Sequence, residues 1–200
     1  MTDLFTEKSK NFDASDMVRN MSSAVGSSIL KNIPFNEIMN VMDFGAGTGL
    51  ISSHVAPLVN KIVAVDISQS MLEKLTSKPE LSGKVQAVCR DIIDKPLDEK
   101  FDLIMSAMAL HHVKDTNDII RVISEHLKPD GRIALADLDK EDGSFHPANT
   151  EGVFHFGFDR DELKEILENN DFCDIRFTTA HIIHGETKDY PLFLVTAKKS

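Results

Sequence analysis

A chain of 200 residues with 42% hydrophobic content has the size and composition of one globular domain, which buries its core without disulfides or a structural metal. The net charge of −10, the isoelectric point near 5.2 and the scattered basic residues argue against nucleic acid as a partner. A polar start, the lack of an apolar run of membrane-spanning length and two cysteines without ligand spacing predict a cytoplasmic protein with reduced thiols, no metal site and no membrane contact.

The first predicted element is an amphipathic helix over residues 14–33, with an apolar residue at every fourth position from Met17 to Ile33. Residues four apart share one face of a helix, so core packing explains this stripe most simply. We assign residues 1–35 to an N-terminal helical segment and residues 36–200 to the main part of a single domain.

Strands and helices then alternate along the chain. Predicted strands cover residues 40–44, 61–66, 84–91, 101–108 and 131–139, and predicted helices cover residues 50–59, 68–77 and 116–127. We place the N-cap of the third of these helices at Thr116 or Asn117. The alternation predicts an α/β fold with a mostly parallel sheet, helices on both faces and a ligand at the carboxyl ends of the strands.

The last third of the chain has a different pattern. Residues 140–158 are rich in Gly, Asn, Phe and His without a clear period, which predicts a long loop. A helix is expected over residues 159–170, and two strands over 172–183 and 190–199 are separated by a connection short enough for an antiparallel hairpin.

The turn after the first predicted strand combines an acid with a glycine cluster. Asp43 directly precedes Gly45, Gly47 and Gly49. Glycine lets the backbone turn tightly and approach a ligand, although a glycine-rich turn alone is a weak signal. The spacing GxGxG with an acid in front differs from the GxGxxG fingerprint, whose amides bind a pyrophosphate. A carboxylate here favours a cationic ligand over a dinucleotide.

Two more acids follow the second and third predicted strands. Asp66 is positioned to accept hydrogen bonds from a ribose diol, and its alternative role is to begin the next helix, for which Ser68 is better placed. Asp91 precedes Ile92, so that an acceptor for an adenine amino group and an apolar surface lie side by side. Acids at the ends of three successive strands, with a glycine turn on the first, predict an adenosine-type ligand.

Segments 43–49, 66–68, 89–92 and 101–113 together resemble the class I methyltransferases that depend on S-adenosylmethionine (SAM), particularly the small-molecule group related to the quinone-biosynthesis C-methyltransferases. The resemblance covers roughly residues 36–198. It implies a Rossmann-like fold whose seven-stranded, mostly parallel sheet ends in an antiparallel C-terminal strand.

The resemblance also implies roles for individual residues. It implies that the turn at Gly45, Ala46, Gly47 and Gly49 lines the methionine part of SAM and that Asp43 binds its ammonium group. Asp66 would bind the ribose, and Ile67 would contact one face of the adenine. Asp91 with Ile92 would bind the adenine amino group, and Ser106 or Met105 would make the contact from the fourth strand. The N-terminal segment resembles a lid in which Phe12 packs over the site.

Three histidines are candidates for the methyl-acceptor side. His111 and His112 follow the fourth strand at the mouth of the predicted cleft, where they serve either as a general base or as packing residues. His155 is the third candidate and lies in the loop 140–158. A base is not obligatory, since proximity alone contributes roughly 7 to 11 kcal/mol and a base contributes about 10²- to 10⁴-fold in rate.

The loop itself has two interpretations. Phe145, His146, Phe154 and Phe156 predict an aromatic acceptor pocket or, equally, a loop folded on its own apolar cluster. A metal site is disfavoured because its conceivable ligands lack a recognised spacing. Those conceivable ligands are Asp137, Asp139, His146 and His155.

We therefore predict a methyltransferase that uses SAM, releases S-adenosylhomocysteine and transfers the methyl group by in-line displacement to a small-molecule acceptor. The alternatives are a non-catalytic SAM-binding or partner-activating module and, less favoured by the glycine spacing, an NAD-dependent oxidoreductase. The acceptor, the acceptor atom and the oligomeric state stay open at this stage.

Overall fold

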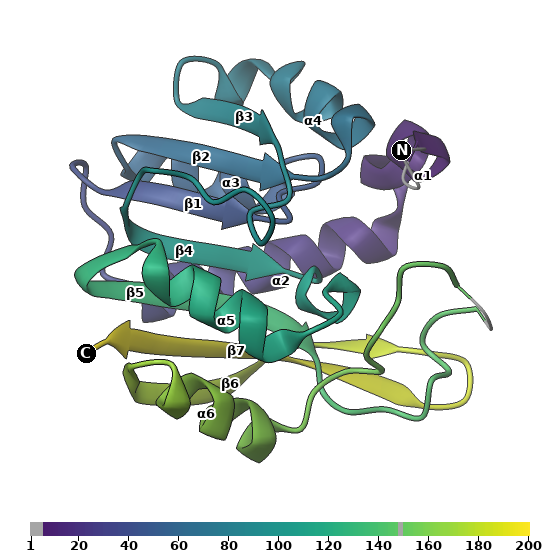
Figure 1. Ribbon diagram of the computed structural model, residues 1–200. Helices are drawn as coiled ribbons and strands as arrows, with labels where there is room; N and C mark the ends of the chain where they lie inside the picture. The colour runs from purple at the N-terminus through teal and green to yellow at the C-terminus, as the bar shows by residue number, and fades with distance from the viewer. Residues whose placement is uncertain (1–5, 148–149) are drawn as a thin grey trace.

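Seven strands form one sheet in the computed structural model, which describes residues 6–147 and 150–200. The strands are β1 Asn40–Phe44, β2 Lys61–Asp66, β3 Val85–Cys89, β4 Phe101–Ala107, β5 Leu127–Leu138, β6 Phe172–His184 and β7 Asp189–Lys199. Their order is β3-β2-β1-β4-β5-β7-β6, and β7 is the strand that runs antiparallel to its neighbours (Figure 1). The expected seven-stranded, mostly parallel sheet with an antiparallel C-terminal strand is confirmed.

Helices cover both faces of the sheet, as predicted. The helices are α1 Thr6–Asn11, α2 Asp16–Asn32, α3 Leu50–Val55, α4 Gln69–Thr76, α5 Thr116–Glu125 and α6 Arg160–Asn169. Helices α2, α3 and α4 pack on one face with Leu103 of β4, whereas α5 and α6 pack on the other face with the neighbouring Ile104. Successive strand residues point to opposite faces, so the near-continuous apolar strands build two cores at once.

Several element boundaries differ from the sequence prediction. Helix α3 ends at Val55 and continues as a 3-10 turn, because Pro57 lacks the N–H that an α-helix requires. Helix α5 is capped by Asp115, whose side chain accepts a hydrogen bond from the Asp118 amide at 3.1 Å, so the predicted cap at Thr116 or Asn117 is wrong. Strand β5 begins at Leu127, which pairs with Phe101, several residues earlier than predicted.

The N-terminal segment and the long loop lie on the same side of the molecule as the carboxyl ends of β1, β2 and β4 (Figure 1). Residues 1–5 of the N-terminal segment and residues 148–149 of the loop fall outside the described part of the chain. Within residues 6–147 and 150–200, no helix is both long and apolar enough to cross a membrane. The two cysteines, Cys89 and Cys173, are free thiols.

Candidate active site

A cavity of about 820 Å³ lies at the carboxyl ends of the parallel strands. This is the end of an open α/β sheet where ligands bind, because the loops there diverge on either side of the switch in strand order. Among the predicted site residues, the cavity is lined by Asp43, Gly45, Ala46, Gly47, Asp66, Ile67, Asp91, His111 and His112. Nine of the 13 predicted site residues therefore line one cavity.

The three glycines of the turn after β1 have different reasons to be glycine, although all have positive φ angles. A β-carbon at Gly45 would lie 2.3 Å from that of Ala109, and one at Gly49 would lie 2.8 Å from the side chain of Leu75. At Gly47 a β-carbon would meet no atom within 4 Å, and this residue lines the cavity. Gly45 and Gly49 thus serve packing, whereas Gly47 keeps space open in the cavity.

The buried carboxylate of Asp43 lies at the floor of the cavity. It accepts a hydrogen bond of 2.7 Å from the Ser52 hydroxyl on α3. Burial raises the pKa of Asp43 from 3.8 to about 7, and the nearby charge of Asp66 adds to the shift. The carboxylate is therefore costly to ionise unless a cation comes close to it.

Asp66 at the end of β2 braces the glycine turn. One carboxylate oxygen accepts a hydrogen bond from the Gly47 amide at 2.8 Å, and the other accepts one from the Ser68 amide at 2.8 Å. Ser68 is the N-cap of α4, as its position in the sequence predicted, since its hydroxyl accepts a hydrogen bond from the Met71 amide. Each carboxylate oxygen has a second lone pair, so Asp66 can also accept a hydrogen bond from a ligand hydroxyl.

Four predicted site residues do not line the cavity, and the packing explains why. The side chain of Ile92 is fully buried in the core, and its neighbour Ile93 lines the cavity in its place. Ser106 is buried and donates a hydrogen bond to the Phe44 carbonyl oxygen at 2.8 Å. Gly49 packs against α4, as described above.

His155 is the fourth of these residues. It lies beside a second, smaller pocket, where its Nε2 is 2.9 Å from the Val113 carbonyl oxygen. A ring nitrogen at this distance from a carbonyl oxygen donates its proton, so Nε2 carries hydrogen in the tautomer that fits. His155 therefore supports the loop from outside the cavity.

His111 forms a buried pair with Asp137 at the end of β5. Nδ1 of His111 lies 2.8 Å from one carboxylate oxygen of Asp137, and the His111 amide donates a hydrogen bond of 3.2 Å to the other. The Leu138 amide donates a further hydrogen bond of 2.8 Å to Asp137. From the sequence, Asp137 was predicted only as a conceivable metal ligand, although an acid at the end of an apolar central strand is itself a signal of a functional site.

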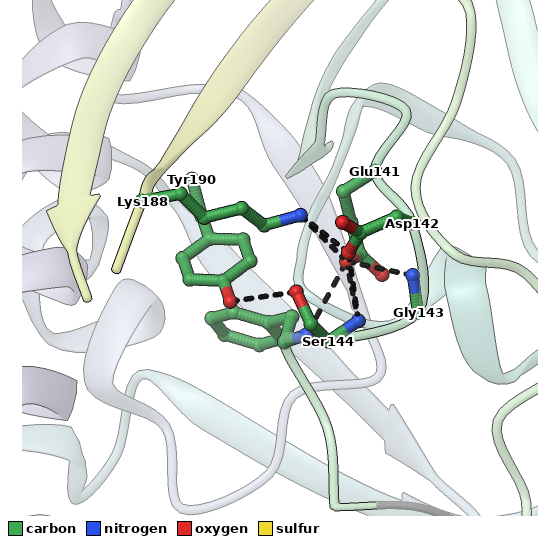
Figure 2. Close-up of polar contacts among 7 residues, drawn as sticks. Glu141, Asp142, Gly143, Ser144, Lys188 and Tyr190 are labelled. Carbon is green, nitrogen blue, oxygen red and sulfur yellow. Dashed lines mark hydrogen bonds and ion pairs between the residues drawn. The ribbon is translucent and has the colours of Figure 1, made fainter. Parts of the chain in front are cut away.

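The loop after β5 is tied to the β6–β7 hairpin next to the cavity (Figure 2). Glu141 accepts hydrogen bonds from the amides of Gly143, Ser144 and Phe145 at 2.8 to 3.2 Å. The Ser144 hydroxyl lies 2.9 Å from the hydroxyl of Tyr190 on β7. These contacts fix the backbone so that Phe145 reaches the cavity wall.

A lysine of the hairpin strengthens the same anchor (Figure 2). Lys188 forms an ion pair with Asp142, and this contact holds the pKa of the Asp142 carboxyl below its usual value. Nζ of Lys188 also lies 3.7 Å from Glu141. The charge of the lysine thereby offsets that of two neighbouring acids.

A second set of bonds ties the end of the loop to the turn after β4. His112 Nδ1 lies 2.6 Å from the Gly152 carbonyl oxygen, and the Phe154 amide donates a hydrogen bond of 2.9 Å to the His111 carbonyl oxygen. Phe154 lines the cavity, as do Phe145 and His146, whereas Phe156 does not. Of the two interpretations of the loop, the aromatic wall of a pocket is the one that the packing supports.

The N-terminal segment reaches the same cavity from the opposite side. Phe12 and Met17 line it, and Met17 is 50% exposed, so the first residue of the predicted apolar stripe does not pack in the core. Asp13 accepts a hydrogen bond from the Thr48 hydroxyl in the glycine turn and forms an ion pair of 2.7 Å with Lys78. Phe12 was predicted to pack over the site. The contacts of Asp13 could not be predicted, because Thr48 and Lys78 lie far from it in the sequence.

The residues considered as metal ligands do not converge. Asp139 forms a bidentate pair with Arg160 at 2.7 and 2.8 Å, Asp137 holds His111, and His155 contacts a carbonyl oxygen. Within the described part of the chain, no group of three or more His, Cys, Asp or Glu residues is arranged to hold a metal ion.

Comparison with known proteins identifies the family. Residues 42–135 match the family profile described as a methyltransferase domain. The chain is 32% identical over 148 residues to an uncharacterized methyltransferase of Schizosaccharomyces pombe, covering 66% of this chain and 52% of that protein. It is 31% identical to a ubiquinone biosynthesis O-methyltransferase of Xanthomonas euvesicatoria, covering 52% of this chain and 45% of that one. The chain thus spans about half the length of these curated relatives.

A solved structure agrees with these sequence matches. The N-methyltransferase NodS of Bradyrhizobium japonicum, crystallised with S-adenosylhomocysteine, superposes with a TM-score of 0.72 at 15% identity, over 94% of this chain and 90% of that one. At that identity the likeness concerns the fold. Residues 42–135 thus form a methyltransferase domain, and the chain has the fold of the class I SAM-dependent methyltransferases.

Proposed function

We propose that this protein binds SAM in the acidic part of the cavity and transfers its methyl group to a small-molecule acceptor in the apolar part. The observation that carries the proposal is the continuity of the cavity. One space of about 820 Å³ reaches from the glycine turn with Asp43 and Asp66 to His111 and Phe145. A volume in the range of small-molecule sites, with carboxylates at one end and aromatic rings at the other, suits a cationic nucleoside beside an organic acceptor.

The residues at the acidic end fit SAM. Gly47 leaves open the space that a β-carbon would fill, so a ligand can lie against the backbone of the turn. Asp43, whose pKa is raised to about 7 by burial, is suited to a ligand that carries an ammonium group, because a nearby cation favours the charged carboxylate. Asp66 would accept hydrogen bonds from the ribose hydroxyls with its remaining lone pairs.

The adenine end follows the same logic. Ile67 is 63% exposed at the cavity wall, which leaves an apolar surface for one face of the ring. Asp91 also lines the cavity, where its carboxylate can accept a hydrogen bond from the amino group. Ile93, in place of Ile92, would supply the second apolar contact. SAM bound here would provide an electrophilic methyl group on sulfur.

An NAD-dependent oxidoreductase is a weaker alternative. The pyrophosphate of NAD would lie against the first turn of the sheet, beside the carboxylate of Asp43. A carboxylate repels a nearby phosphate, and no residue of the turn 45–49 is basic to offset this repulsion. A non-catalytic SAM-binding module is disfavoured by the second half of the cavity, because His111 and the aromatic wall would then have no ligand.

The N-terminal segment would act as a lid. Phe12 and Met17 line the cavity, and Asp13 connects the segment to the glycine turn through Thr48. A closed lid excludes water and holds the acceptor behind the methyl carbon, which is the geometry that an in-line displacement requires.

Titration calorimetry with SAM, S-adenosylhomocysteine and NADH tests this proposal. We expect binding of the first two compounds and none of NADH. A screen for S-adenosylhomocysteine release across phenols, thiols, amines and quinols then tests the transfer. Binding of NADH without binding of SAM would overturn the proposed function, and binding of SAM without turnover of any acceptor would favour the non-catalytic module.

A further inference from the structure

His111 lines the cavity, and Asp137 lies buried behind it. Both side chains are buried, with 1% and 0% of their surface exposed. Asp137 accepts three N–H donors, which are Nδ1 and the backbone amide of His111 and the amide of Leu138. A carboxylate held by these donors fixes both the tautomer and the orientation of the His111 ring.

The other ring nitrogen of His111 has no such partner. With Nδ1 donating to Asp137, Nε2 carries a lone pair, and no described residue gives this buried atom a hydrogen bond. Buried polar atoms are nearly always paired, so an unpaired one at the wall of a cavity indicates a ligand contact.

Two other imidazole rings lie beside that of His111. The ring centroid of His111 lies 4.1 Å from that of His112 and 5.1 Å from that of His146 on the loop. Because Nε2 is buried, a neighbouring group has to move before an acceptor can touch it. The other titratable groups that line the cavity are Asp43, Asp66, Arg90, Asp91, Lys114, Asp115 and Asp118.

We propose that His111 is the general base of this enzyme, that Asp137 is its positioning residue, and that the acceptor is a neutral, apolar molecule with a phenol-type hydroxyl group. This inference rests on the proposed function, because it assumes SAM as the methyl donor. It goes further by naming the class of acceptor, and the unpaired nitrogen of the buried pair is the observation that carries it.

Atoms and charge balance in this step. An oxygen lone pair of the acceptor forms the new O–C bond while the S–C bond of the sulfonium breaks, and the electrons of that bond stay on sulfur as a neutral thioether. The hydroxyl proton moves to Nε2 of His111, and the resulting imidazolium is stabilised by the charge of Asp137. The products are a methyl ether and S-adenosylhomocysteine, and the proton later leaves His111 for water.

The need for a base narrows the acceptor. A carboxylate is already ionised at neutral pH, and a neutral amine attacks with its own lone pair, so neither requires proton removal before attack. A thiol ionises more readily than a phenol, whose pKa in water is about 10. A phenol-type hydroxyl therefore gains most from a histidine base. The net charge of −10 and the acids of the cavity also disfavour an anionic acceptor.

The apolar wall agrees with this class of acceptor. Met17, Phe145 and Phe154 line the same cavity as His111, and Met17 and Phe154 are half exposed. Apolar surface beside a few placed polar groups is typical of sites for aromatic or alkyl-substituted small molecules.

The test compares two phenols in the intact protein. One is 4-butylphenol, which is neutral at about pH 8, and the other is its 2-nitro derivative, which is largely ionised there. In Asp137→Asn and His111→Gln we expect S-adenosylhomocysteine release with 4-butylphenol to fall by about 10²- to 10⁴-fold. Release with the ionised phenol should fall by less than about 5-fold, because that acceptor has no proton to lose. The pH profile for 4-butylphenol should also flatten.

A matched control is available on the surface. His184 and Asp189 form a pair with the same geometry, an Nδ1 to carboxylate distance of 2.7 Å, on the β6–β7 hairpin away from the cavity. Asp189→Asn should leave the rates with both phenols unchanged. Thermal unfolding checks each variant, and where Asp137→Asn does not fold, His111→Gln decides by the same comparison.

Each outcome bears on the inference. An equal loss of rate with both phenols, no loss, or turnover of only amines or thiols would overturn it. If the wild type turns over neither phenol, the inference is likewise overturned, and calorimetry with 4-butylphenol on the S-adenosylhomocysteine complex then separates a wrong acceptor class from a wrong base. If the protein binds SAM in these experiments, the proposed function is supported even when the inference fails. If it does not bind SAM, both the proposed function and the inference are overturned.

Discussion

The two ends of the cavity are built in different ways. The acidic end consists of short segments that each follow a strand, with Asp43 and the glycine turn after β1, Asp66 after β2 and Asp91 after β3. The opposite end is assembled from the N-terminal segment, the turn after β4 and the long loop, which are far apart in the sequence. The first end carries three acids at strand ends of the sheet. The second end carries the aromatic side chains of the loop, which side-chain contacts hold in place.

This difference separates two tasks. Strand ends in a parallel sheet have nearly fixed relative positions, so they suit the constant task of binding the methyl donor. Loops and terminal segments tolerate sequence change without loss of the fold, so they suit the variable task of selecting an acceptor. If this division is right, substitutions at the acidic end should change SAM affinity strongly, and those in the turn after β4 and in the long loop should change acceptor turnover instead.

The largest expected effect is the contrast between Asp66→Ala and His146→Ala. Removing Asp66 deletes the proposed ribose contacts and also the bonds to the Gly47 and Ser68 amides. Hydrogen bonds to a charged group contribute about 1.5 to 3 kcal/mol each, so SAM affinity should fall at least about 100-fold. His146→Ala should change it by less than about 3-fold. Equal affinities by calorimetry would contradict the placement of the ribose.

The second effect concerns the cost of keeping Asp43 ionised. Asp43→Asn should weaken SAM binding about 30-fold, because the ammonium group loses its counter-ion, and it should stabilise the free protein. The folded pKa of about 7 exceeds the value of 3.8. Stability from this group is therefore fully present below about pH 4 and is lost as the pH rises through 7.

The gain from Asp43→Asn should accordingly be absent below about pH 4, grow as the pH rises from 4 to 7 and reach at most about 4 kcal/mol above pH 7. Urea unfolding at the two pH values measures it. Because a bound cation favours the ionised carboxylate, the SAM affinity of the wild type should rise as the pH increases through about 7, and that of the variant should not. A parallel pH dependence in both proteins would show that Asp43 does not face the cation.

A third, smaller effect distinguishes the space that a glycine leaves for a ligand from the backbone strain that an alanine causes at positive φ. Gly47 and Gly83 both have positive φ angles, of 53° and 75°, and a β-carbon at either would meet no atom within 4 Å. Only Gly47 lines the cavity. Alanine at either position should cost about 1 kcal/mol of stability, but only Gly47→Ala should weaken SAM binding, by about 10-fold. Similar SAM affinities in the two variants would place the ligand away from the turn.

The smallest effect is expected at the lid. Asp13→Asn should weaken the contacts with Thr48 and Lys78 and speed SAM dissociation about 2- to 5-fold, because partly exposed ion pairs contribute about 0.2 to 1 kcal/mol. Surface plasmon resonance measures the rate. Glu168→Gln, which removes an exposed pair with Lys164 on α6, is the control and should have no effect. An unchanged rate in Asp13→Asn would mean that the segment does not cover the donor.

Much of the fold and of the acidic end could be predicted from the sequence, because the signals are local. An apolar run that closes with an acid predicts a strand with a carboxylate at its end, as at Asp43 and Asp66, and the glycines after Asp43 add a tight turn. The seven-stranded sheet follows from the same alternation of strands and helices.

Only the tertiary structure decided which neighbour of a pair faces the cavity and which distant residues meet. Ile92 packs in the core, whereas Ile93 lines the cavity. The path of the short loop after β3 determines which of the two side chains faces the cavity. His111 meets Asp137 across 26 positions, and Asp13 meets Thr48 across 35. Such contacts depend on how β4, β5 and the N-terminal segment pack, and no periodicity within a single segment records that packing.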